Sequence, residues 1–133
     1  MKLTRKGEYA LLALIDLVEH LGDGHVSSKD ISVRKNIPRK YLEQILLILR
    51  RGGYALSARG AEGGYRLAKD PEKITLAEIL RLIEGALAPV ESVSQYFYEH
   101  TPIEGQKKLL HIFKEIRDQV VQRLEETTLA DIV

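Results

Sequence analysis

A glycine-rich stretch between two short strand-like runs restricts this chain more than any other feature of its sequence. The stretch RGAEGGYRLAKDP, residues 59–71, holds three glycines within five residues. The flanking runs YALS and GYRLA have the length and alternation of strands, so together they predict a β-hairpin with a glycine-rich tip. A nucleotide-binding loop would instead need its glycines between a strand and a helix N-terminus. The sequence therefore favours a hairpin over a phosphate-binding enzyme loop.

A helix expected over residues 39–51, directly before the hairpin, has one apolar and one polar face. Its apolar residues recur at the spacing that places them on one side of a helix. They are Leu42, Ile45, Leu46 and Leu49. The opposite side is polar and largely basic, and glycines at 52 and 53 end the segment. We expect the apolar face to lie in a core and the basic face to lie in solvent.

Helical periodicity predicts two helices before this one and two after it. They are expected over residues 4–21, 28–35, 75–84 and 106–126. Ser28 is the expected N-cap of the second helix, and Thr75 with Glu78 forms the capping-box pattern of the third. Residues 86–105 lack a regular period and contain two prolines, so we expect a loop with one short turn. The closing residues TTLADIV add one more turn.

The last long helix is expected to pair with a second copy of the chain. Twenty-one residues at 1.5 Å each make a rod of about 31 Å, which is long for a domain of this size. We expect its apolar stripe to form a dimer contact. The stripe consists of Leu109, Ile112, Phe113, Ile116, Val120 and Leu124.

Composition excludes several classes of protein. The chain has 133 residues and no cysteine, which rules out disulfides, thiol catalysis and cysteine-ligated metal centres. Residues 1–70 hold 13 Lys and Arg against 8 Asp and Glu, whereas residues 71–133 hold 7 against 11. The first part is therefore suited to a polyanion. Acidic residues interrupt the apolar N-terminal run, so we expect a cytoplasmic protein with no membrane partner.

The order of helix, helix, tight turn, basic helix and hairpin predicts a mainly α, winged helix-turn-helix fold with a long C-terminal dimerisation helix. In such a fold the basic helix fits a major groove of double-stranded DNA, and the hairpin tip reaches the neighbouring minor groove. We expect residues 1–70 to form the DNA-binding domain. Residues 71–133 would then supply a linker helix, an effector-type loop and the dimerisation helix.

Several stretches resemble the BadM/Rrf-two family of bacterial winged-helix regulators, which includes IscR and CymR. They are MKLTRKGEYALLAL, YLEQILLILRRGG, RGAEGGYRLAKDPEKITLAEILRLIEG and TTLADIV. The resemblance covers nearly the whole chain and implies a homodimeric, sequence-specific DNA-binding regulator. By the same resemblance, Tyr41, Glu43 and Gln44 match recognition-helix residues, and Arg59 matches the wing arginine that enters the minor groove.

We therefore expect a regulator, most simply a repressor, that binds an imperfect palindrome and is not an enzyme. The expected DNA-binding residues are Arg39, Lys40, Tyr41, Glu43, Gln44, Arg59, Gly60, Gly63 and Gly64. Pro38 and Lys40 stand where IscR-like members have serines, which predicts a different DNA sequence. A winged helix that binds another protein is the alternative function, and weak salt dependence of binding would indicate it.

The expected sensing loop departs from the cluster-bearing members of the family. The resemblance places their three cysteines near Ser92, Tyr98 and Glu104, whose hydroxyl and carboxylate oxygens are poor ligands for an iron–sulfur cluster. We expect no cluster, no metal and no cofactor, and a small molecule or a partner protein as the signal. Glu99, His100, Glu104 and His111 are metal-ligand types, but their spacing matches no compact metal motif. The aromatic run YFY at 96–98 either lines an effector pocket or packs beside the long helix.

Overall fold

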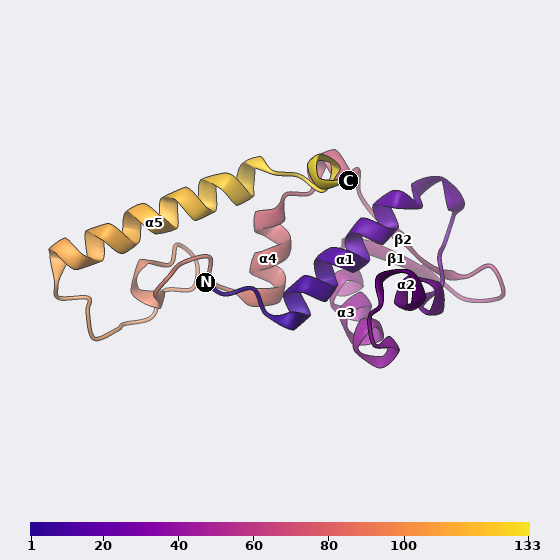
Figure 1. The fold of residues 1–133 in the computed structure, drawn as a ribbon, viewed down its shortest axis with the longest axis horizontal. Coiled ribbons are helices and arrows are strands. Elements are labelled where there is room, and N and C mark those ends of the chain that lie inside the picture. The colour runs from indigo at the N-terminus through magenta and orange to yellow at the C-terminus, as the bar shows by residue number, and fades with distance from the viewer.

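All 133 residues are described by the computed structural model, which contains five α-helices and one two-stranded antiparallel sheet. The elements are α1 (Arg5–Glu19), α2 (Ser28–Lys35), α3 (Arg39–Arg51), β1 (Ala55–Ala58), β2 (Gly64–Leu67), α4 (Leu76–Glu84) and α5 (Lys107–Glu126). Helices α1, α2 and α3 and the hairpin gather at one end of an elongated molecule, and α5 extends from them along its length (Figure 1). The mainly α fold with a hairpin wing is confirmed.

Helix starts follow local side-chain chemistry, with one correction to the sequence prediction. Thr75 and Glu78 form the expected capping box of α4, because each side chain bonds the backbone N–H of the other. Helix α2 is capped by Ser27, not by Ser28, since the Ser27 hydroxyl accepts the Asp30 N–H at 3.1 Å. Two adjacent serines offer the same chemistry, and the extended backbone of Ser27 decides between them.

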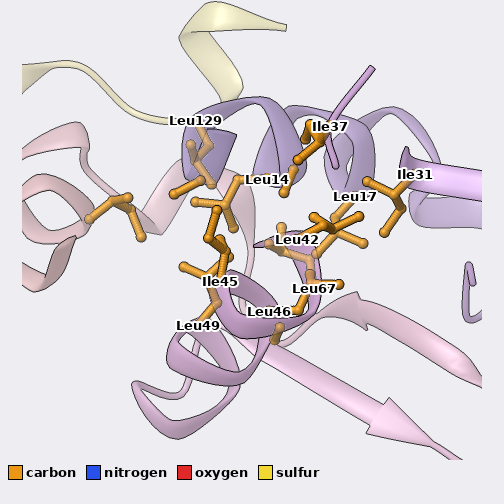
Figure 2. Close-up of a cluster of buried hydrophobic side chains, with 14 of the residues drawn as sticks. Leu14, Leu17, Ile31, Ile37, Leu42, Ile45, Leu46, Leu49, Leu67 and Leu129 are labelled. Carbon is orange, nitrogen blue, oxygen red and sulfur yellow. The ribbon is translucent and has the colours of Figure 1, made fainter. Parts of the chain in front are cut away.

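One core cluster joins the helices at the hairpin end of the molecule. Its 16 buried residues include Leu14 and Leu17 of α1 and all four apolar residues predicted for the buried face of α3. Figure 2 shows the α3 side chains between those of α1 and Leu67 of β2. Packing of α3 against α1 therefore fixes which side of α3 faces outward.

The C-terminal tail returns to this core. Leu129 is fully buried, and its N–H donates to the Ile74 carbonyl at 2.9 Å, while Leu76 N–H donates to Thr127 at 2.9 Å. Thr128 begins the final turn, since its hydroxyl accepts the Asp131 N–H at 3.3 Å. The core thus draws residues from both sides of residue 70, and the division into 1–70 and 71–133 stays a prediction.

The segment between α4 and α5 is a loop with one short helical turn, Glu91–Val93, as expected. Its buried residues Ala88 and Val93 pack on Leu110 of α5. Further along, Val121 of α5 packs with residues of α4. One face of α5 is therefore covered by the chain itself. None of the helices combines the length and the apolar character that a membrane span requires.

Replacing Leu129 by alanine tests how much the tail contributes. Because the side chain is fully buried, we expect Leu129→Ala to lower the free energy of unfolding by about 2–5 kcal/mol in urea denaturation. Ile132→Ala is the matched control in the same tail, because Ile132 is 38% exposed and its removal should change stability by about 0.5 kcal/mol or less. Equal effects of the two variants would contradict insertion of the tail.

Candidate nucleic-acid interface

Helices α2 and α3 are joined by a tight turn that sets the angle between them. Asn36 ends α2 in the left-handed region, with φ 53° and ψ 52°. Ile37 is buried in the core, and Pro38 occupies the N-cap position of α3. The Ser32 hydroxyl donates to the Ile37 carbonyl at 2.5 Å. The two helices and this turn form a helix-turn-helix with α3 as its second helix.

The outward face of α3 presents most of the polar residues predicted for base contact. Arg39, Lys40, Glu43 and Gln44 are all exposed. Glu43 is not free of partners, because Arg39 Nε lies 3.3 Å from its carboxylate and the Ser28 hydroxyl lies 3.4 Å from it. These exposed contacts contribute little to stability, so they can be exchanged for contacts to a ligand.

Tyr41 occupies a different position from its neighbours on α3. Its side chain is half-buried, and its ring meets that of Tyr9 edge to face, with 5.4 Å between the centroids. This packing joins α3 to α1, as the sequence allowed. Contact of Tyr41 with DNA stays a prediction.

The hairpin forms with the register Ala55↔Leu67 to Ala58↔Gly64 and projects from the end of the molecule (Figure 1). Its three tip glycines have different structural reasons. A Cβ at Gly63 would lie 2.4 Å from the Ala58 carbonyl oxygen, and one at Gly64 would lie 2.3 Å from that of Val26. Only Gly60, with φ +100°, stands in open space. The fold itself therefore requires glycine at 63 and 64, whereas Gly60 leaves the tip free for a close approach to a ligand.

Arginines surround the hairpin tip. Arg59 precedes Gly60 and is exposed, and Arg66 is exposed on β2. Neither of them takes part in an ion pair within the chain. Together with Arg39 and Lys40 of α3 they give this end of the molecule the cationic side chains that bind a polyanion.

A buried ion pair that the sequence reasoning missed holds α2 against α1. Asp16 is fully buried, and Arg34 donates to both of its carboxylate oxygens at 2.8 and 2.9 Å. These hydrogen bonds raise the pKa of the Arg34 guanidinium. The available signal was a carboxylate within the apolar face of the first helix, between Leu14 and Leu17. The pair fixes the position of the helix-turn-helix on α1.

The base of the hairpin is tied to α4 by a second polar contact. The Tyr54 hydroxyl donates to Glu78 at 2.8 Å, and Lys69 Nζ lies 4.7 Å from the centre of the Tyr54 ring. Burial, followed by the hydrogen bond to Glu78, raises the pKa of Tyr54 to about 12. Because Glu78 also caps α4, one carboxylate joins the start of that helix to the root of the hairpin.

These features define a winged helix-turn-helix DNA-binding protein. The sequence profile of the Rrf2 family, described as "Iron-dependent Transcriptional regulator", matches residues 3–133. The chain belongs to the Rrf2 family, and it is a DNA-binding transcriptional regulator, not an enzyme.

Relatives and solved structures agree over nearly the whole chain. The regulator CymR of Bacillus subtilis is 39% identical over 132 residues, which are 99% of this chain and 89% of CymR. IscR of Yersinia enterocolitica is 32% identical over 134 residues, covering 100% of this chain and 79% of IscR. The solved structure of B. subtilis CymR superposes with a TM-score of 0.79 at 36% identity, covering 99% and 95% of the two chains. That of T. potens IscR gives 0.75 at 32% identity, covering 99% and 85%.

The iron named in the family description has to be compared with the side chains of this chain. An iron–sulfur cluster needs thiolate ligands, and the chain has no cysteine. The side chains at the positions expected for cluster ligands make other contacts. The Ser92 hydroxyl lies 2.6 Å from that of Thr101, and Tyr98 donates a hydrogen bond to Glu104. The residues present do not fit an iron–sulfur cluster.

The Asp16–Arg34 pair can be tested against a surface pair between the same two helices. Asp16→Asn leaves Arg34 without its buried counter-charge, and we expect it to lower the free energy of unfolding by about 3 kcal/mol. Glu19→Gln breaks the exposed Lys35–Glu19 pair and should cost less than about 1 kcal/mol. Urea denaturation of both variants makes the comparison, and similar losses would contradict a special role for Asp16.

Proposed function

We propose that this regulator acts as a homodimer, places α3 of each subunit in successive major grooves of an imperfect palindrome, and represses transcription there. The observation that carries the proposal is the exposed polar face of α3, whose opposite face is fixed in the core. Gln44 can bond both N6 and N7 of adenine, and Glu43 can accept a hydrogen bond from cytosine. Arg39 and Lys40 supply charge for phosphates.

The hairpin tip is assigned to the minor groove beside each major-groove contact. Arg59 is exposed and adjoins Gly60, whose open surroundings allow the backbone to come close to a sugar–phosphate wall. The negative potential of a narrow minor groove attracts such an arginine. The anchoring of the hairpin root through Tyr54 and Glu78 supports a fixed distance between the tip and α3.

The outward face of α5 supports the homodimer. Leu109, Ile112 and Ile116 are 40%, 52% and 40% exposed, and they follow one another at helical spacing. An apolar stripe of this kind on a long helix is suited to an identical stripe on a second copy. Two members of the predicted dimer stripe contribute less, because Phe113 and Leu124 pack partly on clusters of their own chain. Val120 is half-buried and borders the outward face.

The loop before α5 is the proposed place for a signal from a small molecule or a partner protein. The cavity beside Tyr96 and Phe97 measures about 10 Å³, which is room for one water molecule. Arg81 lies 4.8 Å from the centre of the Tyr96 ring, so the aromatic run packs against α4. An organic effector would therefore need the loop to move, whereas a protein could bind its exposed aromatic residues directly.

Replacing Arg59 tests the role of the hairpin tip. We expect Arg59→Ala to weaken binding to operator DNA by about 1–3 kcal/mol, mainly at sites with a narrow minor groove. Glu62→Ala is a control at the same tip and should not weaken binding, because it removes a negative charge. Fluorescence anisotropy with labelled duplexes measures both variants, and an unchanged affinity of Arg59→Ala would remove the tip from the interface.

The salt dependence of the same titration separates DNA binding by this surface from the alternative of a protein-binding winged helix. Neutralisation of several phosphates should lower affinity by orders of magnitude between about 50 and 200 mM salt. Binding of the wild-type chain that hardly changes with salt would favour the protein-binding alternative.

A charge placed on the outward face of α5 tests the dimer. Ile116→Asp should convert the dimer to a monomer, because it would bury a carboxylate in an apolar contact, and it should weaken binding to the full palindrome. Lys114→Asp introduces the same side chain at another exposed position of α5 and should leave the dimer intact. Sedimentation velocity reports the assembly state. A wild-type monomer, or a dimeric Ile116→Asp variant, would contradict the assignment.

A further inference from the structure

The loop before α5 brings together three side chains that its sequence spacing does not connect. Tyr98 donates its hydroxyl proton to one carboxylate oxygen of Glu104, and His100 Nδ1 bonds the other oxygen. A phenol, an imidazole and a carboxylate thus converge around a single acidic group. The side chains of Tyr98 and His100 are largely exposed, so a dissolved ion can reach them.

Backbone and hydroxyl contacts hold this group in place. The Glu104 N–H donates to the Thr101 carbonyl at 3.1 Å, which closes the turn between His100 and Glu104. The Thr101 side chain is itself bonded to Ser92 at 2.6 Å, and Ser92 is buried. The start of the loop therefore braces the turn that carries two of the three side chains.

The electrostatic surroundings favour a cation. Residues 91–105 contain Glu91, Glu99 and Glu104 but no lysine or arginine. None of these three carboxylates has a lysine or arginine partner, and Glu104 pairs only with His100. The two arginines that approach the loop pair with other acids, since Arg81 binds Glu125 and Arg117 binds Asp118. The loop carries negative charge that its neighbours do not neutralise.

The donor atoms match the ligand types of first-row transition metals. Carboxylate, phenol and imidazole are oxygen and nitrogen donors, which suit Zn²⁺ and oxidised iron better than they suit the sulfur-rich environment of a cluster. Ligands at about 2.0–2.2 Å from one ion lie about 3 Å from each other, a spacing close to that of hydrogen-bonded groups. An ion can therefore take the place of the protons that now join these side chains.

We propose that Tyr98, His100 and Glu104 form a binding site for one first-row transition-metal ion per chain, with water completing the coordination. The ligands would be the phenol oxygen, the imidazole Nδ1 and the carboxylate. This site is separate from the DNA-binding surface and needs no sulfur ligand.

The site should bind metal more tightly at higher pH. The hydrogen bond to Glu104 raises the pKa of Tyr98, and this phenol has to lose its proton to become a strong ligand. Metal ions compete with protons for such ligands, so binding releases protons. Calorimetry in two buffers of different ionisation enthalpy measures the number released.

The chain contains a matched control for this site. His111 and Glu115 on α5 are also a histidine and a glutamate four residues apart, with 2.9 Å between Nε2 and the carboxylate. They have no tyrosine hydrogen-bonded to the glutamate. A site that requires all three side chains should therefore distinguish the loop pair from the α5 pair.

Calorimetric titration of the full chain with Zn²⁺ tests the proposal. We expect one saturable site per chain, no binding of Mg²⁺ in the same range, and a loss of affinity of about tenfold or more in His100→Ala and Glu104→Gln. Tyr98→Phe should also weaken binding, whereas the double variant His111→Ala with Glu115→Gln should bind as the wild type does. Circular dichroism checks that each variant is folded. With ferric ion, a visible charge-transfer band that disappears in Tyr98→Phe would identify the phenol as a ligand.

Three results would overturn the site. They are the absence of saturable Zn²⁺ binding by the wild-type chain, equal affinity of Glu104→Gln and the wild type, and loss of binding in the α5 double variant alone. None of these results bears on DNA binding, which the duplex titrations measure independently.

Discussion

The packing of α3 against α1 is the contact on which the functional surface depends. Burial of one leucine or isoleucine stabilises the folded state by about 1.5–3 kcal/mol, and α3 buries four of them. A rotation of α3 about its axis would expose part of this stripe and bury Glu43 or Gln44. The free energy that builds the core therefore also decides which side chains face a ligand. The Asp16–Arg34 pair then fixes α2, and with it the turn that leads into α3.

Elements that depend on local sequence could be predicted with accurate boundaries. The apolar period of α3, the glycines that end it and the capping box at Thr75 are each read within a few residues of sequence, and all three are present in the structure. The hairpin was predictable for the same reason. The choice of Ser27 over Ser28 as N-cap was not, because it depends on one backbone angle and not on residue type.

Features that join distant segments could not be predicted from the sequence. Leu129 in TTLADIV gives no sign that it inserts between α1 and α3, more than 80 residues away in sequence. Gly63 and Gly64 were interpreted through the approach of DNA, yet carbonyl groups of the chain itself already exclude a side chain there. The apolar residues of α5 were assigned to one stripe, whereas the helix has a face toward its own chain and a face toward solvent. Partners brought together by folding decide each of these cases.

The attachment of α5 at its C-terminal end makes the helix a lever. Its 20 residues extend about 30 Å from the point where the tail enters the core, and its far end adjoins the loop (Figure 1). A rotation of about 10° at that attachment moves the far end by about 5 Å, which exceeds the rise of about 3.4 Å per base pair of duplex DNA. If two such levers meet along their outward faces, a small tilt changes the separation of the two reading heads by more than one base-pair step. The register between protein and operator is then sensitive to any event that shifts the loop.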